Sequence, residues 1–182
     1  MQRLYLLRLR NAKSNANQGM TLIEIMVVVV ITGILAAIGA PSLMSMLQGD
    51  KVQQGLDQVY SSLQDSQKQA IRLSKQCTIT LNTDADPPTI SSSDTGCLVS
   101  TNRKLPDGVV MKIGSKLDSG ITFSFKGTTT APGTIVVEPK KAKATDEKQC
   151  LVISPGLGIM RKGVYKGDTS SSVTADNCQT SI

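Results

Sequence analysis

The longest apolar run of the chain covers residues 25–49, where no side chain carries a charge. As an α-helix that rises about 1.5 Å per residue, this run is about 37 Å long. The hydrocarbon core of a bilayer is roughly 30 Å thick, so the run predicts a single transmembrane helix over residues 20–49. Pro41 lies inside the run. It predicts a kink in that helix, because proline removes a backbone hydrogen bond.

Beyond residue 49 the apolar positions become periodic. The residues that repeat at the spacing of one helix face are Val52, Leu56, Val59, Leu63, Ala70 and Ile71. Gln and Ser fill most of the other faces. We therefore expect the helix to continue as an amphipathic segment over residues 50–76, to end near Lys75, and to pack its apolar stripe on a globular head.

After residue 76 the pattern changes to short β-type segments separated by turn residues. The predicted strands are Cys77–Leu81, Cys97–Thr101, Val109–Ile113, Ile121–Phe125, Thr134–Glu138, Cys150–Ser154 and Gly163–Lys166. A long N-terminal helix on a small antiparallel sheet gives an α+β fold, with a β-rich head at 77–182. We expect the serine-rich segment 91–96 to be a loop. The polar tail from Asp168 should be disordered unless Cys178 anchors it.

The composition narrows the chemistry that this chain can perform. Its 182 residues include no His and no Trp. Without His there is no Ser-His-Asp or Cys-His nucleophile and no imidazole ligand. We therefore expect no metal site, no cofactor and no enzymatic activity. A pair such as Ser154 and Lys162 is the enzymatic alternative, although no motif marks it. The composition favours a binding or structural protein.

Basic residues are concentrated ahead of the apolar run. Residues 1–19 contain no acid and four cations, which supply +4 of the net charge of +6: Arg3, Arg8, Arg10 and Lys13. By the positive-inside rule the leader lies in the cytoplasm and the head lies outside the cytoplasmic membrane. The small residues at 36–40 leave open a secreted soluble head, because signal peptides are cut after such a site.

Four cysteines lie in the predicted head: Cys77, Cys97, Cys150 and Cys178. None belongs to a CxxC pair, so no zinc or redox motif is indicated. Behind a membrane-targeting segment, an even number of cysteines predicts disulfide bonds. Of three connectivities we favour the pairing of sequence neighbours, which closes the shortest loops and adds roughly 3 kcal/mol per bridge. Four free thiols are the alternative.

The residues Gly19-Met-Thr-Leu-Ile-Glu24, followed by the apolar run, resemble the N-terminus of type IV pilins and type II secretion pseudopilins. The resemblance implies that a prepilin peptidase cuts after Gly19 and methylates the new terminus at Met20. Family members usually carry Phe at the position of Met20. The implied partners are other pilin or pseudopilin subunits, the inner-membrane assembly platform and, before assembly, membrane lipid.

Glu24 is the residue that a plain membrane anchor does not explain. A carboxylate that enters the bilayer costs about 2.5–3.5 kcal/mol on insertion scales, so it requires a partner. In the resembled family this is the glutamate at the fifth mature position, which serves subunit assembly. The methylated amine of Met20 stays cationic, so it can neutralise Glu24 of a neighbouring subunit. An interfacial Glu24 that reaches water is the alternative.

Two segments of the head, 121–137 and 150–163, resemble the pseudopilin H and fimbrial T family of minor subunits. That family has a Gly-Arg-x-Arg-like turn, in which the first arginine is replaced here by Ile159. Members of the fimbrial T type are linked to DNA binding. The candidate DNA contacts in this chain are Arg161, Lys162 and Lys166, and the alternative is a solvated basic loop.

Together these observations predict a minor pilin or pseudopilin. We expect a single-pass inner-membrane precursor whose mature form joins a type IV pilus or a type II secretion pseudopilus, priming or decorating the filament. The alternative function is a pilus-displayed DNA-binding subunit for DNA uptake in natural transformation.

Overall fold

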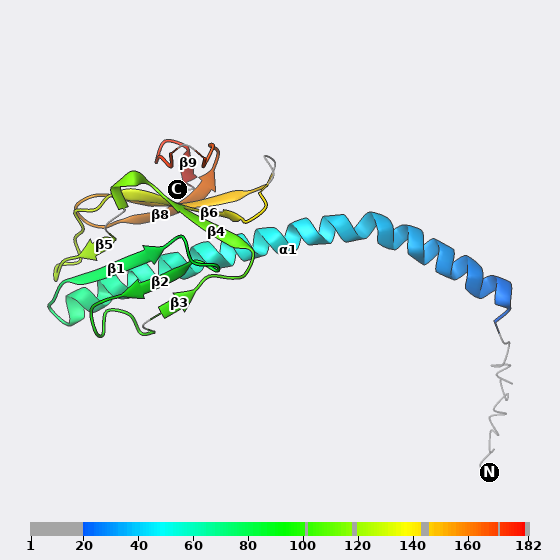
Figure 1. Ribbon diagram of the computed structural model, residues 1–182, viewed down its shortest axis with the longest axis horizontal. Helices are drawn as coiled ribbons and strands as arrows, with labels where there is room; N and C mark the ends of the chain where they lie inside the picture. Colours follow the sequence, from blue (N-terminus) through cyan, green and yellow to red (C-terminus); the bar gives the residue numbers. More distant parts are fainter. Residues whose placement is uncertain (1–19, 101, 118–119, 143–145, 171, 181–182) are drawn as a thin grey trace, which may run out of the picture. The chain divides into compact units, whose positions relative to one another are not determined.

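The computed structural model describes residues 20–100, 102–117, 120–142, 146–170 and 172–180. In this part of the chain one long helix, α1 (Leu22–Arg72), is followed by nine β-strands and a short 3-10 helix, η1 (Ser115–Leu117) (Figure 1). The chain divides into two compact units, Met1–Pro41 and Ser42–Ile182, which we describe separately. The predicted α+β fold, a long N-terminal helix with antiparallel sheets, is confirmed.

In the first unit, α1 is apolar on every side. Its large apolar residues from Leu22 to Ile38 are between 49% and 78% exposed. By length and composition α1 is long and apolar enough to cross a membrane, and it is the one such helix in the described part of the chain. The helix continues through Pro41, and the kink stays a prediction.

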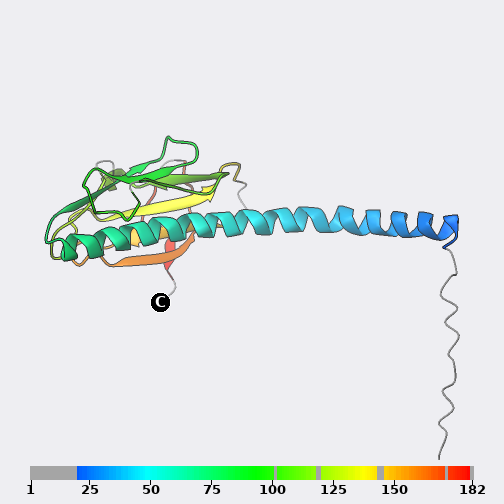
Figure 2. The ribbon, with the colours of Figure 1, turned by 90° about the horizontal axis from the view of Figure 1, so that it is seen from below.

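In the second unit, the remainder of α1 lies along the strands in both views (Figure 1; Figure 2). Five residues of the predicted apolar stripe are buried, with exposures of at most 2% for Val52, Leu56, Val59, Leu63 and Ala70. Ile71 is also predicted to belong to the stripe, but it lies in the last turn of the helix and is 52% exposed. The helix ends at Arg72, slightly before the predicted Lys75. Its end is fixed by Ser74, whose φ of 51° is left-handed, and by the bond from the Lys75 amide to the Ala70 carbonyl. This geometry is a Schellman cap.

The first sheet is antiparallel and has the order β3-β2-β1-β5. Its strands are β1 (Cys77–Asn82), β2 (Thr89–Ser92), β3 (Asn102–Lys104) and β5 (Ile121–Phe123). The predicted strand over Cys97–Thr101 is wrong, because residues 97–100 form a series of bends. Strand β2 includes two serines of the segment expected to be a loop. Its one buried side chain, Ile90, secures it in the core.

The second sheet is also antiparallel, in the order β4-β6-β7-β8-β9. Its strands are β4 (Val109–Ile113), β6 (Gly133–Pro139), β7 (Lys148–Ile153), β8 (Met160–Tyr165) and β9 (Cys178–Thr180). The last strand lies in the tail whose composition is typical of disorder. It is ordered because it pairs with β8 and its Cys178 is bonded to Cys150.

The head contains two apolar clusters on opposite faces of the second sheet. The larger one joins α1 to both sheets and includes Leu56, Ile79 and Leu151. The smaller one consists of Val136, Cys150, Tyr165, Val173 and Cys178, with Val152 packed against it. We call the face that carries this smaller cluster the outer face of the second sheet. We call residues 166–170 and 172–177, which lie between β8 and β9, the C-terminal segment; its Val173 belongs to the smaller cluster.

Candidate processing and assembly site

The residues of the resemblance that the structure describes lie at the very start of α1. Met20 and Thr21 precede the helix, which begins at Leu22. The Glu24 amide donates hydrogen bonds to the Thr21 carbonyl oxygen at 3.1 Å and to Thr21 Oγ1 at 3.3 Å. Thr21 is thus the N-cap, and the spacing of Thr21 and Glu24 is that of a capping box. Gly19 lies outside the described residues.

The carboxylate of Glu24 lies in the first turn of α1, on an exposed residue. The N-terminal end of a helix carries a partial positive charge, which stabilises a carboxylate there. None of the ion pairs between described residues includes Glu24. Because Glu24 is exposed, a cation of another molecule has access to it.

Residues 14–40 match the prokaryotic N-terminal methylation motif. The match runs from the basic leader through the start of α1 into its apolar part. The matched segment therefore includes the end of the leader, the N-cap of α1 and the apolar helix that follows. This motif and the α+β fold support a type IV pilin-like or pseudopilin-like protein.

The motif has consequences for this pilin-like chain. It implies processing by a prepilin peptidase and assembly with other pilin subunits. Together with the apolar helix it fits an anchor in the inner membrane. No curated protein and no solved structure matches the chain significantly. The motif ends at residue 40 and does not include the head.

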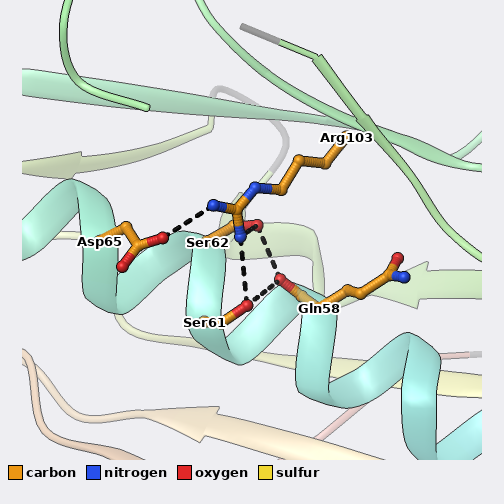
Figure 3. A network of polar contacts seen from close by, with 5 residues as sticks. All are labelled: Gln58, Ser61, Ser62, Asp65 and Arg103. Atoms are coloured by element: carbon orange, nitrogen blue, oxygen red, sulfur yellow. Dashed lines mark hydrogen bonds and ion pairs between the residues drawn. The ribbon is translucent and has the colours of Figure 1, made fainter. Parts of the chain in front are cut away.

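A polar network connects the first sheet to α1 (Figure 3). Arg103 on β3 donates to Asp65 Oδ2 at 2.8 Å and to the hydroxyls of Ser61 and Ser62 at 3.2 and 3.3 Å. The Arg103 and Asp65 side chains are only 24% and 33% exposed, so water screens their ion pair partially. Sequence reasoning missed this tether, because Arg103 lies in a polar three-residue strand with no pattern of its own.

A second tether lies near the C-terminal end of α1. Gln67 Nε2 donates to the Gly127 carbonyl oxygen at 2.7 Å and to the Leu157 carbonyl oxygen at 3.3 Å. Gly127 has a φ of 75°, a left-handed conformation that favours glycine, so a side chain at this position would strain the turn that Gln67 binds. One glutamine thus joins α1 to turns from both sheets.

Both disulfides join sequence neighbours. Cys77 is bonded to Cys97 and Cys150 to Cys178, and no described cysteine is free. The first bond fixes the start of β1 to the loop that replaces the expected strand. The second joins β7 to β9 across the outer face, so it holds the C-terminal segment on the second sheet.

The candidate DNA contacts do not form one surface. Arg161 pairs with Val152 across β7 and β8, on the outer face, and its Nη2 donates to Ser154 Oγ at 3.4 Å. Lys162 points to the opposite face, where its Nζ pairs with Asp57 Oδ1 on α1 at 2.8 Å and lies 5.0 Å from the Tyr60 ring. Lys166 follows the strand and is exposed.

Other basic residues of residues 139–167 are also paired. Lys140 binds Asp86, and Lys148 Nζ lies 3.6 Å from Glu138 Oε2, which also accepts a hydrogen bond from Thr169. These pairs reduce the positive charge that remains for phosphate binding.

The enzymatic alternative finds no support in the contacts of the head. Because Lys162 pairs with Asp57 and Ser154 accepts from Arg161, no described contact links Ser154 to Lys162. Among the described residues no cluster of His, Cys, Asp and Glu could hold a metal ion.

The C-terminal segment is held by polar contacts in addition to its disulfide. The Tyr165 hydroxyl accepts hydrogen bonds from the Thr174 amide at 3.3 Å and from Asn177 Nδ2 at 3.5 Å. Hydrogen bonds from Ser170 hold the pKa of the exposed Asp168 carboxyl below its ordinary value. The bonds to Tyr165 hold Thr174 and Asn177 against β8, whereas the bonds between Ser170 and Asp168 are local to the segment.

Proposed function

We propose that this chain is the precursor of a minor pilin or pseudopilin that is cut between Gly19 and Met20 and N-methylated at Met20. The observation that carries the proposal is the methylation motif over residues 14–40, which coincides with a capped apolar helix. The scissile bond precedes Thr21, so it lies ahead of the helix. Cleavage leaves a helix with an apolar surface on every side, which requires lipid or other subunits around it.

Assembly depends on Glu24 in this proposal. An ammonium about 4 Å from a carboxylate gains about 4 kcal/mol at an effective dielectric constant near 20, which offsets the roughly 3 kcal/mol cost of the buried carboxylate. Before cleavage the nitrogen of Met20 is an amide and carries no charge. Cleavage therefore creates the cation that pairs with Glu24 of a neighbouring subunit, so uncut chains stay in the membrane.

The cleavage site is tested by coexpressing the chain with a prepilin peptidase and sequencing the product by mass spectrometry. We expect a mature chain that begins with N-methylated Met20. Replacement of Gly19 by Val should leave an uncut precursor in the membrane, whereas Asn17→Ala should be processed normally. A mature product from the Gly19→Val variant would contradict the assignment.

The role of Glu24 is tested by comparing Glu24→Gln with Glu24→Asp. Glutamine is close in size but has no charge, so cleavage should proceed and incorporation into sheared filaments should be lost. The aspartate variant keeps the charge and should recover part of the incorporation. Normal incorporation of the glutamine variant would rule out neutralisation as the basis of assembly.

The minor role rests on the resemblance of segments 121–137 and 150–163 to the pseudopilin H and fimbrial T family. A minor subunit that primes filaments acts in small amounts, so its removal should abolish filaments that contain little of it. We would quantify sheared surface pili in a strain without this gene and in the wild type. Unchanged pili, with proteins missing from the culture supernatant, would assign the chain to a secretion pseudopilus instead.

DNA uptake has less support as a function of this head. Arg161 and Lys162 lie on opposite faces of the second sheet, and Lys162 is paired with Asp57. Phosphate binding by several cations would weaken steeply as salt rises. A gel-shift titration of the full chain at low salt tests it, and absence of binding would eliminate the DNA-binding alternative.

A further inference from the structure

A cavity of about 360 Å³ opens between the outer face of the second sheet and the C-terminal segment. Its apolar walls include Val152 from β7 and Val173 from the C-terminal segment, with Pro132 and Pro155 beside the strand ends. Ligand pockets in proteins begin at about 300 Å³, so this one suits a small group.

The cavity contains a hydroxyl that nothing in the described head satisfies. Thr134, the cross-strand neighbour of Val152, lines the cavity and is only 3% exposed. Among the described residues no hydrogen bond uses its side chain, and its hydroxyl is not one of the two fully buried polar atoms without a partner, which are Gln58 Oε1 and Ser66 Oγ. Solvent in the cavity therefore reaches this hydroxyl, and a polar group of a ligand can replace that solvent.

The rim of the cavity carries a cation. Arg161 lies beside Val152 on the outer face, and its Nη2 donates to Ser154 Oγ, which lines the cavity. The four ion pairs between described residues use other cations, so the Arg161 guanidinium is not neutralised by any of these carboxylates. A guanidinium binds a carboxylate through two parallel hydrogen bonds, which makes a carboxylate the matching group.

From this geometry we propose that the cavity binds the free C-terminal end of another polypeptide whose last residue is aliphatic. Arg161 and Ser154 hold the terminal carboxylate, Val152 and Val173 enclose the aliphatic side chain, and the Thr134 hydroxyl bonds the terminal residue. The residues Ser115, Thr174 and Ala175 at the mouth are exposed, so the rest of the bound chain has a way out. A small free acid would leave this mouth open to water.

The second disulfide belongs to this site, because one wall comes from the C-terminal segment. The approach is close: a Cβ atom added at Gly114 would lie 3.0 Å from the Val173 carbonyl oxygen. The Cys150–Cys178 bond holds this segment on the sheet. The site therefore requires oxidised Cys150 and Cys178.

Fluorescence polarisation on the full chain in lipid nanodiscs tests the proposal. The probe is a fluorescein-labelled pentapeptide, glycine-serine-glycine-serine-leucine, with a free carboxylate. We expect saturable binding that falls about tenfold or more when the carboxylate is amidated or when Arg161 is replaced by Gln. Lys162→Gln is the matched control, since it removes the same charge from the next residue on the opposite face, and it should bind like the wild type.

A second variant addresses the cavity itself. Ala175 is exposed at the mouth, so Ala175→Phe should fill the opening without disturbing the core, and binding should be lost. Equal binding of the acid and amide peptides, unchanged binding by Arg161→Gln, or no binding up to about 1 mM probe would overturn the proposal. Displacement of the probe by 3-methylbutanoate as efficiently as by unlabelled peptide would overturn the assignment to a chain end.

Discussion

The two parts of α1 have similarly apolar residues and opposite surroundings. In the part before Pro41 the apolar side chains are exposed all round, while in the part after Ser42 one stripe of them is almost completely buried. The difference lies in the distribution of the polar residues. From residue 48 onward Gln, Ser and Asp fill most positions outside the buried stripe, whereas the first part has no polar face.

This difference shows that one continuous helix can be suited to two environments, a lipid or protein environment in its first part and the interior of the head in its second part. The buried stripe gains its stability within the chain, because both sheets cover it. The uniformly apolar part gains nothing until lipid or other subunits surround it. Identical substitutions in the two parts should therefore have different effects.

Leucine-to-alanine substitutions should give the largest difference in unfolding free energy between the two parts of α1. Leu63→Ala should lower the free energy of unfolding of the head by about 2–5 kcal/mol, because Leu63 is fully buried and its loss leaves a cavity. Leu35→Ala should leave that free energy unchanged. Guanidinium unfolding followed by tyrosine fluorescence measures both. Equal effects of the two variants would mean that the head does not stabilise itself.

An added charge should be harmful in the first part of α1 and harmless on the exposed surface of the second part. Val29→Lys adds a cation to the uniformly apolar part and should disfavour membrane insertion by about 2.5–3.5 kcal/mol. Gln53→Lys adds the same charge to an exposed position of the second part and should have no effect. Carbonate extraction of membranes reports the integrated fraction. Full integration of the Val29→Lys variant would contradict a transmembrane role for this part.

The polar tethers of the second part should contribute less to the free energy of unfolding than the buried leucine does. Arg103→Met should cost about 1–2 kcal/mol of unfolding free energy, because it leaves the half-buried Asp65 without its partner. Lys162→Met breaks a more exposed pair with Asp57 and should cost less than about 0.5 kcal/mol. The same unfolding experiment compares them, and the reverse order would show that Figure 3 depicts a contact of little energetic value.

The smallest effect is expected at the cap of the first part. Thr21→Val removes the hydroxyl that accepts the Glu24 amide and should destabilise the first turn by about 0.5 kcal/mol, whereas Thr21→Ser should preserve it. Hydrogen exchange of the Glu24 amide measures this change. Equal exchange in the two variants would show that Thr21 is not the operative cap.

The helix and the general fold could be predicted because they depend on long periodic patterns. The stripe from Val52 to Ala70 repeats over several turns, so no local competition obscures it. The short strands were less predictable. Cys97 looks β-forming but is held in a loop by its bond to Cys77, and the polar β2 depends on Ile90 alone. Tertiary contacts determine whether such short segments form strands, and the local sequence does not encode these contacts.

The candidate sites also differ in how far local sequence predicts them. The motif around Thr21 and Glu24 is local, so sequence alone locates it. The cavity beside Arg161 is not local, because it depends on which face of β8 the side chain occupies and on the return of the C-terminal segment over β7. In the sequence Arg161 and Lys162 look like one basic pair, and strand alternation places them on opposite faces.

The cap at Thr21 has an electrostatic consequence for the mature chain. Cleavage before Met20 would place a new ammonium only two residues ahead of the first helical residue, beside four backbone N–H groups that have no partner within the helix. Together these groups act as about half a positive charge, which repels the ammonium. Glu24 is the carboxylate of that first turn. Its negative charge offsets part of the repulsion that the helix end exerts on the ammonium.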